Sequence, residues 1–151
     1  MKLLDIIDAT PFPIGYRIAF ITNFLREPIL RRMERELGII RPELTVLMCT
    51  CFREDVHARD ICEVTEQPSN TISRAVSSLE KKGHLSRKED QFDTRKQVLN
   101  ITPSGKEVHD KVMVMFTESE DAMLAGLSEM EKAQLLALLD KIARNVPRWR
   151  P

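Results

Sequence analysis

Long apolar runs are missing from this chain of 151 residues: it has no stretch of about 18 apolar residues, the length that a membrane-spanning helix requires. Its first residues carry Asp5 and Asp8 within an apolar stretch, which argues against a secretory signal. We therefore expect a cytoplasmic protein with no membrane partner. A chain of this length can bury one real core but hardly two, so we expect a single domain over residues 1–151.

Clustered glycines and paired metal ligands are also missing. The five glycines stand singly, so no glycine-rich loop is available to cradle a phosphate. The three histidines, His57, His84 and His109, are scattered, and the chain has no Cys-x2-Cys or His-x3-His pair. A Gly-x-Ser-x-Gly elbow is absent as well. These gaps predict a protein that is not an enzyme and that needs no metal or cofactor.

Cysteine is scarce. Cys49 and Cys51 lie two residues apart on an expected helix, so their side chains point about 200° apart and cannot readily bridge each other. Cys62 lies on the next expected helix. Reduced, inert thiols are the default for a cytosolic protein. The alternative, an oxidation-sensitive switch at one of the three cysteines, stays open.

Neither sign of charge is in excess, because 23 basic residues balance 23 acidic ones. The distribution is uneven, however. Residues 69–100 contain seven Lys or Arg against four Asp or Glu, whereas residues 106–140 contain three against eight. A basic part followed by an acidic part would orient the molecule toward phosphate.

The most informative segment runs from Thr65 to Gly105. Its first part predicts a helix from about Ser69 to Lys82, because Ile72, Val76 and Leu79 recur at helical spacing and Gly83 suits a helix end. The opposite face carries small polar side chains and one arginine, which can reach base edges and phosphates in a major groove. These residues are Ser69, Asn70, Thr71, Ser73, Arg74 and Ser77.

A basic hairpin is expected to follow this helix. The residues from His84 to Arg87 predict a first strand, and Gln97 to Ile101 alternates polar and apolar side chains as a returning strand does. The residues from Lys88 to Lys96 predict a polar loop between them.

The segment resembles the MarR family of winged helix-turn-helix regulators. The resemblance rests on Leu79 to Arg87 (L-E-K-K-G-H-L-S-R), Asp93-Thr94-Arg95, Val98-Leu99 and Thr102-Pro103-Ser104-Gly105, in this order over about 40 residues. It implies that Arg95 enters the minor groove, where a narrow groove attracts arginine, and that Asp93 positions it. One departure is the turn Thr65-Glu66-Gln67-Pro68, where the family usually has a glycine and an apolar residue.

The remaining chain predicts further helices. Three precede the segment, over residues 14–37, from Pro42 to about Phe52, and from Ala58 to Val64. Two more follow Thr102 and are separated near Gly126 and Ser128. The second of these helices is expected to bury Leu44, Leu47, Met48 and Cys51. The fold class expected is mainly α with a small β-hairpin wing (α+β). The winged helix-turn-helix occupies residues 40–102, and residues 14–38 and 103–146 form a helical dimerisation region, as the resemblance implies.

The function expected is that of a sequence-specific, DNA-binding transcriptional regulator. The resemblance implies a repressor that binds a palindromic operator on double-stranded DNA as a homodimer. A helical dimerisation or protein-interaction module with a winged fold is the alternative, as is a cysteine-based redox-sensing repressor. The expected DNA contacts are the six residues of the helix face together with Arg87, Asp93, Arg95 and Lys96.

A small ligand is expected to release the DNA. The resemblance implies a cleft between the dimer helices and the winged part, and an arginine beside aromatic and sulfur-containing walls would suit an aromatic acid. Stripes of Phe and Met at helical spacing are also typical of plain core, so both interpretations stay open. The candidate lining residues are Tyr16, Arg17, Phe20, Phe24, Met48, Phe52, Met113 and Phe116.

Overall fold

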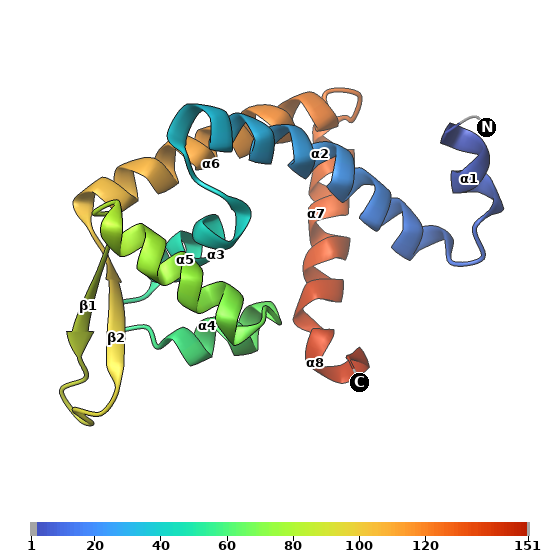
Figure 1. The fold of residues 1–151 in the computed structure, drawn as a ribbon. Coiled ribbons are helices and arrows are strands. Elements are labelled where there is room, and N and C mark those ends of the chain that lie inside the picture. The colour runs from blue at the N-terminus through green and yellow to red at the C-terminus, as the bar shows by residue number, and fades with distance from the viewer. Residues whose placement is uncertain (1–2, 151) are drawn as a thin grey trace. The chain divides into compact units, whose positions relative to one another are not determined.

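The computed structural model describes residues 3–150, which fold mainly into helices with one antiparallel hairpin (Figure 1). This confirms the expected fold class. None of the helices in the described range is long and apolar enough to span a bilayer. The elements are α1 (Leu3–Ala9), α2 (Pro13–Leu37), α3 (Arg41–Phe52), α4 (Ala58–Thr65), α5 (Ser69–Lys81), β1 (Leu85–Glu89), β2 (Gln97–Ile101), α6 (Pro103–Leu124), α7 (Glu129–Arg144) and α8 (Val146–Trp149).

The chain forms two compact units, of which the first ends at Phe116 and the second begins at Thr117. The first unit holds α1 to α5, the hairpin and most of α6. The second holds the end of α6 with α7 and α8. At the start of α7, the Ser128 hydroxyl accepts a hydrogen bond from the Glu131 backbone N–H, and the Glu131 carboxylate accepts one from the Ser128 backbone N–H. This capping box confirms the helix start expected near Ser128.

The core of the first unit forms where α3, α4, α5 and the hairpin meet. Ile72, Val76 and Leu79 of α5 are buried as expected. On α3 the prediction was partly wrong, because Leu44 and Leu47 are buried but Met48 is 38% exposed and Cys51 is half-buried. The buried face of α3 is instead made by Glu43, Leu44, Val46, Leu47 and Thr50. Cys51 lies one residue, or about 100°, beyond that face.

The wing is a regular two-stranded antiparallel ladder. Its first strand begins and ends later in the chain than the sequence predicted. β1 pairs with β2 from Leu85↔Ile101 to Glu89↔Gln97, so Lys88 and Glu89 belong to the strand and not to the loop. His84 stands outside the strand, because its backbone N–H donates to the carbonyl of Leu79 at 2.9 Å and closes the end of α5. Val56 adds a further antiparallel bridge to Leu99 of β2.

A close approach between backbones joins the wing to α6. The Thr102 hydroxyl donates to the carbonyl of Gly83 at 2.7 Å and accepts from the backbone N–H of Gly105 at 3.1 Å. The Thr102 backbone N–H donates to the carbonyl of His84 at 3.2 Å. Any Cβ on Gly105 would collide with the backbone of His84. The Thr-Pro-Ser-Gly motif is therefore the helix start that packs against the turn after α5.

Candidate nucleic-acid interface

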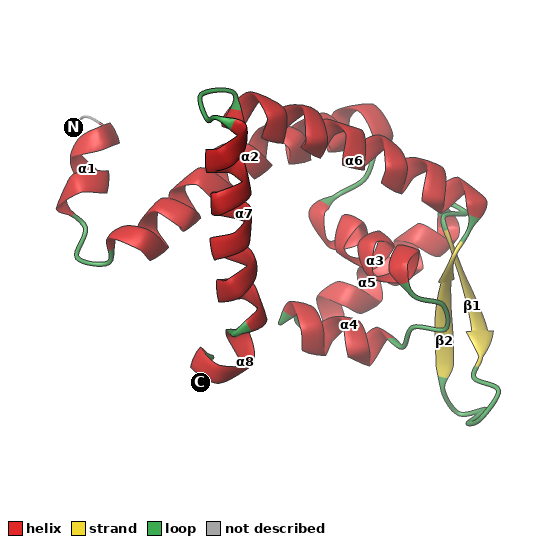
Figure 2. Cartoon of the chain, turned by 180° about the vertical axis from the view of Figure 1, so that it is seen from behind, coloured by secondary structure: helices red, strands yellow, loops and turns green. Residues whose placement is uncertain are grey.

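The outer face of α5 carries an uninterrupted set of polar side chains. Ser69, Asn70, Ser73, Arg74 and Ser77 are exposed, and Thr71 is half-buried. The opposite face of α5 is buried in the core, where α5 packs against α3 (Figure 2). The helix thus holds a rigid row of hydrogen-bonding groups toward solvent, which is what reading base edges requires.

An ion pair between the buried Glu43 and the partly exposed Lys82, which the sequence did not predict, fixes the far end of α5. The Lys82 ammonium lies 2.7 and 2.9 Å from the two carboxylate oxygens of Glu43, and it also donates to the carbonyl of Gly38 at 2.7 Å. Glu43 is 1% exposed. Burial raises the pKa of Glu43, but hydrogen bonds from Lys82, Ser78 and the Ile40 backbone together hold it below its ordinary value. The pair locks α5 to the ends of α2 and α3.

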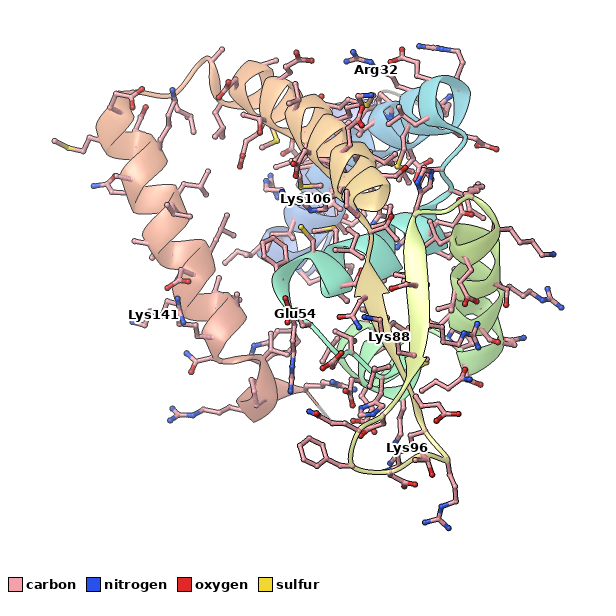
Figure 3. All side chains as sticks on the ribbon, turned by 90° about the vertical axis from the view of Figure 1, so that its left-hand side faces the viewer. Arg32, Glu54, Lys88, Lys96, Lys106 and Lys141 are labelled. Atoms are coloured by element: carbon pink, nitrogen blue, oxygen red, sulfur yellow. The ribbon has the colours of Figure 1, made fainter. Side chains whose placement is uncertain are left out.

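The tip of the wing presents Arg95, whose side chain is 90% exposed. Asp93 accepts hydrogen bonds from the Arg95 backbone N–H and from its Nε, both at 3.2 Å. These bonds, the backbone one first, lower the pKa of Asp93 and keep it ionised. Lys96, labelled in Figure 3, lies with its Nζ 3.7 Å from the same carboxylate. The two neighbouring cations are thus brought together at the tip.

Arg87 does not stand free on the surface. Its guanidinium donates to the Glu80 carboxylate at 2.6 Å and to the Gln97 amide oxygen at 3.2 Å. The side chain therefore braces both wing strands against α5. If Arg87 contacts DNA, its side chain must either keep these hydrogen bonds to Glu80 and Gln97 or exchange them for bonds to the DNA.

His57 and Asp90 form a second anchor that sequence reasoning did not find. The distance from His57 Nε2 to Asp90 Oδ2 is 2.7 Å, and the other Asp90 oxygen accepts from the backbone N–H groups of Phe92 and Asp93. The Phe92 amide first, and then His57, lower the pKa of Asp90. Only the fold brings the two residues together, because 33 positions separate them in the chain.

The turn before α5 takes the left-handed conformation at Glu66, with φ of 56°. Glycine adopts this region without steric cost, whereas a residue with a Cβ does not. The backbone strain of this turn therefore falls on Glu66.

The candidate ligand residues fall into separate groups in the first unit. The rings of Tyr16, Phe20 and Phe24 follow one another along α2, with centroids 6.3 and 4.8 Å apart. Arg17 is engaged elsewhere, because it donates to the carbonyls of Ile7 and Pro13 and to the Asp8 carboxylate. Phe52 meets the ring of His109 edge-on. Met113 and Phe116 are half-buried against the core, whereas Met48 is exposed.

The three cysteines are unbridged. Burial raises the pKa of the Cys49 thiol, which disfavours the reactive thiolate. Cys51 lies beside His109 and Asp110 of α6, a cluster that the scattered positions in the sequence did not reveal.

Comparison with known proteins identifies relatives of the same architecture. The model of the MarR family matches residues 37–96. The regulator BilQ of Clostridium symbiosum, an HTH-type transcriptional regulator, is 29% identical over 84% of this chain and 90% of its own length. The crystal structure of the transcriptional regulator SlyA superposes with a TM-score of 0.75 at 27% identity, covering 88% of this chain and 93% of that one. A variant of MepR from S. aureus, bound to an oligodeoxyribonucleotide, has a TM-score of 0.61 at 23% identity and covers 89% of this chain and 99% of its own.

Proposed function

Because this chain belongs to the MarR family of winged helix-turn-helix transcriptional regulators, we propose that it represses transcription by binding a palindromic DNA operator as a homodimer and is released by a small ligand. The observation that carries the proposal is the pairing of an exposed polar face on α5 with an exposed arginine at the wing tip. The relatives are regulators and not enzymes, which agrees with the absence of catalytic motifs from the sequence.

In the proposed complex, α5 lies in the major groove. Asn70 and Arg74 are the residues able to make bidentate contacts, with adenine and guanine respectively, while the serines reach phosphates or base edges. The oligonucleotide bound to the MepR variant supports this use of the fold. The ion pair between Glu43 and Lys82 holds the helix so that few degrees of freedom are lost on binding.

The wing is proposed to add a minor-groove contact. Arg95 extends from the tip, and Asp93 fixes its backbone and its Nε while leaving the terminal guanidinium nitrogens able to donate. Lys96 adds a second positive charge beside it. An arginine presented in this way suits a narrow groove with strong negative potential.

Exposed apolar side chains support a homodimer. No side chain of α7 is buried within the described part of the chain, although this helix carries many large apolar residues. In water such a face is expected to bury itself against a partner. The exposed large apolar residues of α7 are Met130, Leu135, Leu136, Leu138, Leu139 and Ile142. A twofold axis would place two copies of α5 about 10 base pairs apart, so the operator is proposed to be palindromic.

An aromatic acid remains the proposed class of effector, with the neighbouring, mutually tilted rings of Tyr16, Phe20 and Phe24 as its apolar wall. Arg17 could supply the carboxylate contact only by leaving its bonds to Asp8 and to the carbonyls of Ile7 and Pro13. Binding of such an acid should therefore loosen α1 from α2.

The test is fluorescence-anisotropy titration of the full chain with the DNA that flanks its own gene, at several salt concentrations and with random DNA as competitor. The proposal expects binding that resists the competitor and that weakens steeply with salt, because phosphate contacts release counterions. Binding without sequence preference by a folded dimer would reject the regulator proposal in favour of a protein-interaction module. Aromatic acids added to the preformed complex test the release step.

A further inference from the structure

Three potential metal ligands from two helices converge beside the end of α3. Cys51 Sγ lies 3.5 Å from His109 Nδ1, and that nitrogen lies 2.9 Å from Asp110 Oδ1. The ligand atoms of the three residues all fall within 4.8 Å of one another. We propose that Cys51, His109 and Asp110 bind a divalent transition metal of the zinc class. This site is separate from the DNA-binding face and does not depend on the proposed function.

The donor set suits such an ion. A thiolate, an imidazole nitrogen and a carboxylate oxygen are the groups that bind zinc in proteins, and three protein ligands leave a fourth position for water. With metal–sulfur and metal–nitrogen bonds of about 2.3 and 2.0 Å, a tetrahedral ion separates its sulfur and nitrogen ligands by about 3.5 Å. That value equals the separation of Cys51 and His109.

The arrangement does not suit acid–base catalysis. In a nucleophile relay, histidine uses one ring nitrogen for the nucleophile and the other for the carboxylate. Here the Cys51 thiol and the Asp110 carboxylate both meet Nδ1 of His109. Convergence on a single nitrogen cannot pass a proton from the thiol to the carboxylate, whereas all three ligand atoms lie within 4.8 Å of one another, close enough to share one ion.

His109 is the most deeply buried of the three proposed ligands. Its side chain is 5% exposed, and its Nε2 is buried with no hydrogen-bond partner among the described residues. A buried polar atom without a partner is uncommon and costs free energy, so packing alone does not account for a histidine at this position.

An ion can reach the cluster from solvent. Cys51 lines an open cavity of about 740 Å3 together with Glu54, Lys88 and other polar residues, and Asp110 is exposed on the surface of α6. Figure 3 labels Glu54 near the loop after α3 and Lys106 on the first turns of α6.

Lys106 competes with the metal. Its ammonium lies 2.9 Å from Asp110 Oδ2. A bound cation must displace this ammonium from the carboxylate. Removing the charge in Lys106→Gln should therefore tighten metal binding, although none of the three ligands is changed.

The experiment is titration of the reduced full chain with Co2+, a spectroscopic substitute for Zn2+, followed by displacement with Zn2+. Binding forms a metal–sulfur bond and releases the Cys51 thiol proton to the buffer, so affinity rises with pH. We expect one ion per chain, a thiolate-to-cobalt charge-transfer band, loss of that band on Zn2+ addition, and tighter binding in Lys106→Gln.

Cys51→Ser should abolish the band, while the matched variants Cys49→Ser and Cys62→Ser should keep it. Cys51 is only half-buried and serine is similar in size, so the fold of this variant, checked by its circular dichroism, should persist. Absence of the charge-transfer band from the wild type would overturn the proposal. Persistence of the band in Cys51→Ser would overturn it too, because the thiolate would then lie elsewhere.

Discussion

His57 joins the start of α4 to the wing loop through Asp90, with 2.7 Å between Nε2 and the Oδ2 atom. The same carboxylate receives the backbone N–H groups of Phe92 and Asp93, so one side chain fixes both the attachment and the shape of the loop. The loop in turn carries Asp93 and Arg95. The position of the wing tip thus depends on a contact with the helix-turn-helix itself.

Replacing this histidine should loosen the loop without unfolding the protein. In His57→Ala we expect faster hydrogen exchange at the amides of Phe92 and Asp93, because the Asp90 carboxylate that accepts from them loses its contact with the ring of His57. Exchange measured by NMR is the readout. His84→Ala serves as the control, since His84 contacts Ser104 at the other end of the hairpin. Equal exchange in both variants would show that the anchor does not order the loop.

Acid should have the same local effect in the wild type. Because the pKa of Asp90 is held below its ordinary value of 3.8, its stabilising contribution is present above that pH and is lost as the pH falls through the lower folded-state value. Exchange at the Phe92 amide, relative to amides of the core helices, should therefore rise only in that acid range. A rise that begins near neutral pH would contradict the assignment to Asp90.

Much of the fold followed from sequence because its signals are local. Helical spacing of Ile72, Val76 and Leu79 fixed the buried face of α5, and the alternation from Gln97 to Ile101 fixed β2. The pairs formed by His57 with Asp90 and by Glu43 with Lys82 could not be predicted, since each joins residues more than 30 positions apart. The cluster of Cys51 and His109 could not be predicted either, because 58 positions separate these two residues. The short helices α1 and α8 carry too few turns for a periodic signal.

Gly105 should tolerate no side chain. A Cβ at this position collides with the backbone of His84, which belongs to the turn after α5 and cannot move aside as a flexible side chain does. We expect Gly105→Ala to reduce the free energy of unfolding by about 1–3 kcal/mol, the usual cost of overpacking. Urea denaturation measures it. Gly126→Ala, where a Cβ meets open space, should stay within about 0.5 kcal/mol of wild type.

The ion pair between Glu43 and Lys82 should give stability that depends on pH. Lys82→Met leaves the buried carboxylate of Glu43 without its cation, and we expect a loss of about 1–2 kcal/mol at pH 7. The value lies below that for a fully buried pair because the Lys82 side chain is 35% exposed and screened by solvent. Lys81→Met, an exposed neighbour, is the control and should change stability little.

The sign of the pH effect follows from the lowered pKa of Glu43. Its contribution is complete above the ordinary value of 4.5 and disappears as the pH falls through the lower folded-state pKa. The wild type should therefore lose more stability than Lys82→Met on acidification below pH 4.5. Denaturation curves at neutral and acid pH compare the two losses, and parallel losses would show that Lys82 does not depress the pKa of Glu43.

Replacing Glu66 by glycine should relieve backbone strain in the turn before α5. Its left-handed φ of 56° disfavours any residue with a Cβ, but its side chain also interacts with its surroundings. Comparing Glu66→Gly with Glu66→Ala removes the side chain in both and isolates the backbone cost. We expect the glycine variant to be more stable than the alanine variant by about 1 kcal/mol in thermal or urea unfolding. Equal stability would mean that the turn relaxes in the alanine variant.

Arg95 provides the sharpest test of the wing. If its guanidinium enters the minor groove, Arg95→Ala should weaken operator binding by about 1–3 kcal/mol and lower the salt slope by about one. Asp93→Ala should weaken binding less, because it leaves the charge in place and removes only the hydrogen bonds that orient it. Arg35→Ala, which removes an exposed arginine on α2, controls for the general loss of positive charge.

Anisotropy titrations against operator and random DNA separate two roles of Arg95. A loss of affinity confined to the operator indicates shape readout, whereas an equal loss on both DNAs indicates a phosphate contact. Unchanged affinity on both would remove Arg95 from the interface and leave α5 as the sole reader.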